Sequence, residues 1–408
     1  MADLQTLRTQ IRAAHLADEA ALLNDLQTTA QISDATKSAA TTRAVNLVTK
    51  IREQGDSGMM EVFMAEYGLS TDEGIALMCL AEALLRVPDS ETVDALIEDK
   101  IAPSDWGSHL GKSSSSLVNA STWALMLTGK VLHDEEPGIA ATLKSAVRRL
   151  GEPVIRTAVS RAMRELGAQF VLGETIREAV SRGKSKARHG FTYSYDMLGE
   201  AALTANDAEK FYDSYADAIK SLAKHCKSDD IRENPGISIK LSALHPRYEL
   251  GQSERVMREL VTSTKRLARM ARKANMGLNI DAEEADRLDL SLDVIEAVLR
   301  DPDLAGWDGF GVVVQAFGKR CNGVIDWLHQ LATDLDRKIM VRLVKGAYWD
   351  TEIKRAQVEG TEGFPVFTRK AATDVAYICN AQKLLGLTDR IYPQFATHNA
   401  HTVAAILE

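Results

Sequence analysis

The chain has 408 residues with 45% hydrophobic content, enough for two or three domains with hydrophobic cores of their own. Its formal net charge of −8 and its pI near 5.7 disfavour nonspecific binding to nucleic acid, so we expect no nucleic-acid partner. There is no signal-peptide pattern, no apolar run near the roughly 20 residues of a membrane span, and no paired cysteine spacing, so we expect a cytoplasmic protein without a metal site.

Up to about residue 185 the sequence is typical of helices, because apolar residues recur at three- and four-residue spacing. The expected helices are Leu4–Leu26, Thr41–Glu66, Thr71–Arg86, Glu91–Asp99, Pro153–Glu165 and Glu174–Ser181. A serine run, Ser113–Ser116, predicts a loop, and no strand is expected in this half. We interpret residues 1–50 as an N-terminal helical arm and residues 51–185 as a helical domain.

After Lys186 short apolar runs alternate with longer amphipathic stretches. The expected strands are Phe191–Leu198, Gly236–Leu244, Gly277–Glu283, Gly309–Ala316, Lys338–Ala347 and Ile391–Asn399. The expected helices between them are Asp207–Lys227, Ser253–Asn275, Ser291–Leu299, Asn322–Asp334 and Arg369–Leu385. This alternation predicts an α/β fold with a parallel sheet, either doubly wound or a (β/α)8 TIM barrel. Because no strand is followed by the GxGxxG fingerprint of a dinucleotide site, we favour the barrel.

The chain ends at Glu408, inside the helix that follows the sixth expected strand. A (β/α)8 barrel needs two more strands to close, and an open arc of strands would leave unpaired edges. We therefore expect residues 186–408 to form a barrel that is truncated after its sixth βα unit, and the chain to be the N-terminal fragment of a longer protein.

Polar residues stand near the C-terminal ends of these strands, where barrel enzymes carry their catalytic groups. Arg342 interrupts an apolar strand, and a guanidinium there is unfavourable unless an anionic or electron-rich group meets it. Glu283 and Glu284, in the third run, are expected to be solvated or to bridge loops. The two-residue period of a strand predicts one cluster drawn from five strands, namely Lys240, Asp281, Gln315, Arg342 and His398.

Each member of this cluster also has a purely structural interpretation. Asp281 is as well explained by an ion pair with Lys240 or Arg342 as by a catalytic role. Gln315 could satisfy a neighbouring backbone group, and His398 could be a hydrogen-bonded core histidine. The convergence of polar groups from five strands favours a functional site over these separate explanations.

Three kinds of chemistry fit such a cluster. A divalent metal is disfavoured, because the sequence has no HxH or HExxH spacing and the nearby cations would repel it. A Schiff-base lyase would use Lys240 or Lys345 as its nucleophile, with a lowered pKa. An anionic or electron-accepting cofactor would be held by Arg342 and the lysines, and the turn at Gly346 would let the backbone approach it. A non-enzymatic oligomerisation fragment is a further alternative.

Several runs of this sequence resemble the proline dehydrogenase part of PutA (proline utilization A), a family of bifunctional bacterial flavoenzymes. The resemblance covers roughly residues 50–408, and it rests on YDMLGEAA at 195–202, GISIKLSALHPRYE at 236–249, NIDAEEADRL at 279–288, RLVKGAYWDTEIKRAQV at 342–358 and PQFATHNAHTV at 393–403. It implies a distorted (β/α)8 barrel that binds FAD, preceded by a helical domain and an arm.

The resemblance also implies an activity and partners. The expected reaction is oxidation of L-proline to Δ1-pyrroline-5-carboxylate by hydride transfer to FAD, the first step of proline catabolism to glutamate. Electrons would pass to a membrane quinone through peripheral contact with the inner membrane, and an aldehyde dehydrogenase domain would follow in the full-length protein. A homo-oligomer is compatible with the resemblance.

The family pattern carries over to named positions of this chain. Arg342 matches the arginine beside the flavin N5 edge, and Asp281 matches the active-site aspartate. Lys240 matches the lysine that pairs with the proline carboxylate, and Tyr348 an aromatic side chain of the proline pocket. The implied cofactor contacts are Gln315, Arg342, Lys345, Gly346, Ala347, Thr368, Thr397 and His398.

Two features depart from the wider family. The chain opens directly on the helical arm, so it resembles the class without a ribbon-helix-helix DNA-binding domain. The RRLxEN run that carries the carboxylate-binding arginines in the family does not occur in this sequence, so we expect it beyond Glu408.

Overall fold

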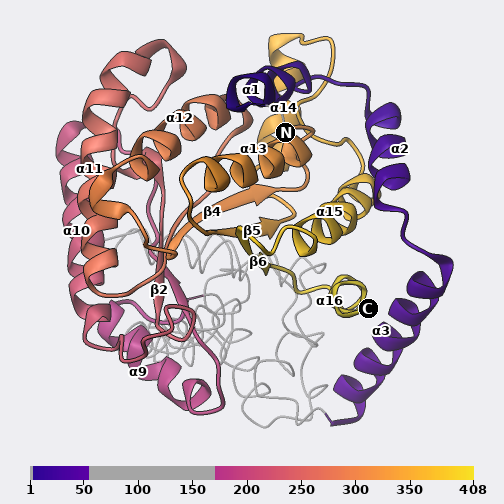
Figure 1. Ribbon diagram of the computed structural model, residues 1–408, viewed down its shortest axis with the longest axis horizontal. Coiled ribbons are helices and arrows are strands. Elements are labelled where there is room, and N and C mark those ends of the chain that lie inside the picture. The colour runs from indigo at the N-terminus through magenta and orange to yellow at the C-terminus, as the bar shows by residue number, and fades with distance from the viewer. Residues whose placement is uncertain (1–2, 55–170) are drawn as a thin grey trace, which may run out of the picture. The chain divides into compact units, whose positions relative to one another are not determined.

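The computed structural model describes residues 3–54 and 171–408 (Figure 1). The chain divides into two compact units, residues 1–50 together with 183–408, and residues 51–182. The expected helices at 71–86, 91–99 and 153–165, the end of the helix expected at 41–66, and the serine loop at 113–116 lie outside the described residues.

The N-terminal arm consists of α1 (Leu4–Ala13), α2 (Glu19–Ala30) and the start of α3 (Asp34–Gln54). The expectation of one helix over residues 4–26 is wrong, because Asp18 caps a new helix by accepting a hydrogen bond from the Ala21 N–H at 2.7 Å. Leu26 packs on Phe367 and Ala376, so α2 is attached to the C-terminal part of the chain.

Within the described residues six strands form one parallel sheet in the order β1-β2-β3-β4-β5-β6. They are β1 (Ser194–Asp196), β2 (Gly236–Ile239), β3 (Leu278–Ile280), β4 (Phe310–Gln315), β5 (Ile339–Val344) and β6 (Ile391–Phe395). Each strand pairs with the next along the chain. A doubly wound sheet reverses its strand order at a switch point, so the sequential order excludes that alternative.

All six predicted strands are confirmed, but each ends before its predicted C-terminus. The second strand illustrates the cause, since the chain leaves the sheet at Lys240 and enters a 3-10 turn over Leu241–Ala243. Lys240 and Asp281 are therefore each the first residue beyond their strand. In the sixth strand the error matters more, because His398 lies three residues past Phe395 and no longer follows the alternation of the strand.

Helix α9 (Ile176–Ala187) precedes β1 in the sequence. The later helices follow one another around the strands (Figure 1), and they are α10 (Ala205–Ala223), α11 (Ser253–Lys273), α12 (Leu288–Leu299), α13 (Cys321–Asp334), α14 (Trp349–Glu359), α15 (Lys370–Leu385) and α16 (Ala400–Leu407). The sequence pattern missed α14, which buries only Glu352 and Ala356 and so has no apolar stripe to reveal it. None of the helices in the described ranges is long and apolar enough to cross a membrane.

The core lies between the strands and these helices. The apolar side chains that alternate along β2 to β5 are almost fully buried, namely Ile237, Ile239, Leu278, Ile280, Val312, Val314, Val341 and Leu343. Trp327 of α13 and Tyr377 of α15 are fully buried against them. The predicted apolar face of the sheet is confirmed, and the opposite face is left for polar groups.

A buried arginine of the arm binds to helices that pack around the sheet. Arg8 is only 5% exposed, and its Nη2 donates to Asp293 Oδ1 and to the Asp289 carbonyl oxygen, each at 2.8 Å. Its guanidinium also lies 5.7 Å from the centre of the Trp327 ring. The arm is therefore held by charge and by stacking together.

We expect Arg8→Met to lower the free energy of unfolding by about 2 kcal/mol, because two charged hydrogen bonds are lost from a buried site. The measurement is the urea unfolding curve. Arg12→Met is the matched control, since Arg12 bonds to Asp289 at 2.8 Å from a side chain that is 53% exposed, and we expect it to cost under about 1 kcal/mol. Equal losses in the two variants would contradict this assignment.

Candidate functional site

A lysine between two carboxylates lies at the C-terminal ends of the first three strands. Lys240 Nζ lies 3.0 Å from Asp281 Oδ2 and 3.0 Å from Asp196 Oδ1. The side chains of Lys240 and Asp281 are 14% and 15% exposed, so water screens this pair weakly. Asp196 ends β1 and Lys240 and Asp281 follow β2 and β3, so three neighbouring strands deliver the cluster.

The charges of this cluster influence one another. Burial alone would lower the pKa of Lys240, but the attraction of Asp281 and Asp196 outweighs it and the pKa is raised above its usual value. Burial raises the pKa of Asp281, and Lys240 and Arg342 oppose that rise. Lys240 is thus a permanent cation at neutral pH, which suits it to bind an anion and not to act as a nucleophile.

Arg342 is held by hydroxyl groups. Its Nη2 donates to Ser194 Oγ at 2.9 Å and its Nη1 donates to Ser238 Oγ at 3.1 Å. In the part of the chain that the structure describes, no carboxylate forms an ion pair with it. Arg342 lines a cavity of about 440 Å³ together with Asn279 and Gln394. The guanidinium therefore keeps its full charge available to a ligand in that cavity.

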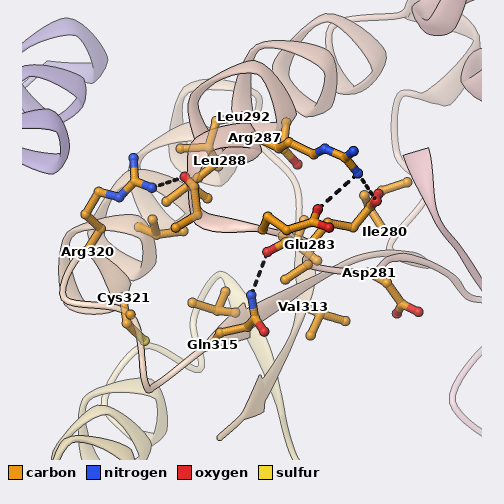
Figure 2. Close-up of a pocket in the computed structure, with 18 of the residues that line it drawn as sticks. Ile280, Asp281, Glu283, Arg287, Leu288, Leu292, Val313, Gln315, Arg320 and Cys321 are labelled. Atoms are coloured by element: carbon orange, nitrogen blue, oxygen red, sulfur yellow. Dashed lines mark hydrogen bonds and ion pairs between the residues drawn. The ribbon is translucent and has the colours of Figure 1, made fainter. Parts of the chain in front are cut away.

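Gln315, the last residue of β4, connects the loops that follow β3 and β5, the strands on either side of it. Its Nε2 donates to the Glu283 carbonyl oxygen at 2.9 Å, as Figure 2 shows, and its Oε1 accepts from the Ala347 N–H at 3.1 Å. The Ala347 loop contains Gly346 at φ +144°, where a Cβ atom would lie 2.5 Å from the Phe317 ring. Only glycine fits there, so the backbone of this loop stays close to the strand ends.

Two more side chains at the end of β5 have partners of their own. Lys345 forms an ion pair with Asp374 of α15. Tyr348 donates its hydroxyl to Glu200 Oε2 at 3.1 Å, and burial together with Glu200 raises the pKa of this phenol. Tyr348 is therefore a neutral, half-buried side chain that joins the loop after β5 to the loop after β1.

Three of the predicted cofactor-binding residues, Thr368, Thr397 and His398, form no contact with the cluster around Lys240 among the hydrogen bonds and ion pairs of the described residues. The Thr368 N–H and hydroxyl both donate to Glu19 Oε2 of the arm, each at 3.0 Å. Thr397 Oγ1 accepts from the Asn399 N–H at 3.1 Å. His398 is exposed beyond the end of β6. The expectation that His398 shares a level with Lys240 is wrong, because the parity rule was applied past the end of the strand.

Sequence reasoning missed several members of the site. Ser194 and Asp196 both belong to β1, and the alternation that selected polar residues in the other strands would also have selected them. Glu283 is buried and not solvated, but it does bridge loops as the alternative expectation had it. No three His, Cys, Asp or Glu side chains gather into a metal-binding group within residues 3–54 and 171–408.

Comparison with known proteins assigns the chain. The family model described as proline dehydrogenase matches residues 179–408, more than half of the chain. The chain belongs to the proline dehydrogenase family. The model described as the proline utilization A proline dehydrogenase N-terminal domain matches residues 5–52, over the arm.

Relatives of this chain include bifunctional PutA proteins. It is 55% identical to that of Klebsiella aerogenes over 370 residues, 90% of this chain and 28% of that protein. It is 51% identical to that of Escherichia coli K12 over 406 residues, 98% of this chain and 31% of that protein. A crystal structure of a Bradyrhizobium japonicum PutA mutant superposes with a TM-score of 0.70 at 48% identity, over 96% of this chain and 39% of that one. The chain spans about a third of the length of these curated relatives.

One comparison runs against an expectation drawn from charge. Residues 59–170 match a family model described as the DNA-binding domain of proline dehydrogenase. The expectation that the chain has no nucleic-acid partner is therefore not supported. The matched segment is itself acidic, with 10 lysines and arginines against 16 aspartates and glutamates, so its net charge gives no sign of this match.

Proposed function

We propose that this chain is the proline dehydrogenase region of a PutA-type enzyme and oxidises L-proline to Δ1-pyrroline-5-carboxylate. Family membership supports the reaction class. The observation that carries the proposal is the Arg342 guanidinium, which faces a cavity with hydroxyl partners and no ion pair to a described carboxylate. A cation held in this way stabilises negative charge that develops on a neighbouring electron acceptor.

The residues at the strand ends fit FAD as the cofactor. FAD, when bound, supplies the acceptor for the hydride that leaves proline. Arg342 would hold the edge of the flavin on which charge develops, and Gln315 with the backbone of the Lys345-Gly346-Ala347 loop would support it. We keep Thr368, Thr397 and His398 as proposed contacts to the rest of the cofactor. For Thr368, this contact requires the hydrogen bonds to Glu19 to open.

The substrate would be bound by the cluster around Lys240. The permanent cation of Lys240 suits the proline carboxylate, and the Tyr348 ring suits the wall of an apolar pocket. Removal of a hydride from carbon requires the amine nitrogen to lose a proton, so a base is needed. We propose Asp281 as the acceptor of that proton, since burial raises its pKa toward the range of an effective base.

The wider assignment follows from the same family. We propose that β1 to β6 are six of the strands of a distorted (β/α)8 barrel. Residues 1–50 would form its arm and residues 51–185 a helical domain. The rest of the protein would supply the closing strands and an aldehyde dehydrogenase domain. The protein would be cytoplasmic and would contact the inner membrane peripherally, where electrons would pass to a quinone. It would act as a homo-oligomer or as a monomer.

Observations on the lysines weigh against the Schiff-base alternative. A Schiff-base lysine needs a lowered pKa, and that of Lys240 is raised by two carboxylates. Lys345 is engaged in an ion pair with Asp374. A protein that acts only in assembly would not need a partly buried cation between two acids, so the enzyme is the better explanation.

The test is anaerobic reduction of the intact protein. We expect it to purify with a yellow flavin spectrum that bleaches on addition of L-proline. Flavin that stays oxidised with saturating proline would overturn the proposed reaction, and protein that stays colourless in saturating FAD would overturn the cofactor. Trapping of substrate on Lys240 by borohydride would favour the lyase instead.

A further inference from the structure

A continuous series of hydrogen bonds joins the loops at the ends of the first three strands. The Ala201 N–H, after β1, donates to Ser242 Oγ at 3.0 Å, and the Ala202 N–H donates to the Ser242 carbonyl oxygen at 2.9 Å. The Ser242 N–H, after β2, donates to Glu283 Oε1 at 3.0 Å. Ala201 has φ +54°, unusual for a residue with a side chain, so its loop depends on these bonds.

The same series continues to the fifth strand. The carbonyl oxygen of Glu283 accepts from Gln315, and Gln315 in turn accepts from the Ala347 N–H. Tyr348 then bonds back to Glu200 of the first loop. Glu283 is the member that uses both its side chain and its main chain, so it holds the loops on both sides of β3.

Glu283 stands beside the substrate-binding groups without touching the cavity around Arg342. Figure 2 shows its carboxylate turned toward Arg287, whereas the Asp281 carboxylate points away from that pair. The side chain of Glu283 is 4% exposed, and Arg287 Nη1 donates to Oε2 at 2.9 Å. Its partner Ser242 lies two residues after Lys240, on the short turn that sets the direction of the lysine.

We propose that Glu283 is a positioning residue, whose hydrogen bond from the Ser242 N–H fixes the Lys240 turn against Asp281 and so sets the affinity for the substrate carboxylate. The proposal rests on the proposed function for the identity of the substrate. A free backbone N–H in a buried turn is costly, so without the Glu283 carboxylate the turn would move to find another partner. That movement would carry Lys240 away from its ion pair with Asp281.

Two conservative variants separate this role from that of the charge. Glu283→Asp keeps the charge for Arg287 but is shorter by about 1.5 Å, too short to reach the Ser242 N–H. Glu283→Gln keeps an acceptor for that N–H but loses the charge. Glu284→Asp is the matched control, since Glu284 pairs with the same arginine at 3.0 Å and is not bonded to Ser242.

The experiment measures KM and kcat for L-proline in the intact protein, and the dissociation constant of cyclopentanecarboxylate by calorimetry. We expect Glu283→Asp to raise KM and the dissociation constant about tenfold, with kcat within about threefold. Glu283→Gln and Glu284→Asp are expected to stay within about threefold of wild type, with unchanged flavin content. The proposal would be overturned if Glu283→Asp has the KM and dissociation constant of wild type. It would also be overturned if Glu283→Gln raises both constants as much as Glu283→Asp does.

The two proposals fail in different ways. If wild-type protein is not reduced by proline, the proposed function is wrong, and the cyclopentanecarboxylate titration still tests whether Glu283 positions a carboxylate site. If wild type is reduced and Glu283→Asp behaves like it in both measurements, the positioning role is wrong and the function stands. Melting temperatures of the variants check that each is folded.

Discussion

Proline-dependent flavin reduction in the Arg342→Met variant is expected to be about 10²- to 10³-fold slower than in wild type, the range found when one preorganised electrostatic group is removed from an active site. The reason is geometric. Arg342 is fixed by Ser194 and Ser238 and forms no ion pair within the described residues, so its charge is available to the electron acceptor. The measurement is the rate of bleaching under anaerobic single-turnover conditions, with flavin content determined separately.

A second arginine on the same cavity provides the control. Arg232 also lines that cavity, but Asp230 neutralises it in an ion pair of its own. Arg232→Met should therefore leave the rate within about threefold of wild type. The assigned role of Arg342 would be refuted by a variant that loses most of its flavin while the retained flavin is reduced at the normal rate.

The two-residue period of strands predicted part of this site correctly. It brought Lys240 and Asp281 together because both lie immediately after their strands, where the alternation still holds. Arg342 was identified in another way, because a charged side chain is conspicuous in an apolar run. The alternative explanation of Asp281 as half of an ion pair with Lys240 is also confirmed, and it accompanies the proposed function instead of replacing it.

Other parts of the structure depend on contacts that no local pattern reveals. Thr368 meets Glu19 across 349 residues of sequence, so nothing near Thr368 predicts that its donors are taken. Helix α14 has no apolar stripe, and one of its two buried residues is the charged Glu352. The Glu352 carboxylate accepts a hydrogen bond from the Ala285 N–H, a contact that no apolar pattern predicts. The sequential sheet, by contrast, was predictable from the alternation of strands and helices alone.

The Lys240→Met variant is expected to raise KM for L-proline about 10²-fold, because truncating one partner of a buried charged contact typically costs 2–5 kcal/mol. Removal of the lysine would weaken binding of the substrate carboxylate. It would also leave Asp196 and Asp281 without the cation that lies between them. Lys383→Met is the control, since it removes an ion-paired lysine, bonded to Asp326 at 2.6 Å, from elsewhere in the same unit. A KM unchanged from wild type would remove Lys240 from the substrate site.

The same variant makes a prediction about pH. Lys240 lowers the pKa of Asp281 against the opposing effect of burial, so the pKa of Asp281 rises further when the lysine is removed. A smaller fraction of Asp281 is then ionised at any given pH. If Asp281 accepts the amine proton, the acidic limb of kcat/KM against pH should move to higher pH in Lys240→Met and stay in place in Lys383→Met. An acidic limb that does not move would show that another base, such as water, accepts the proton.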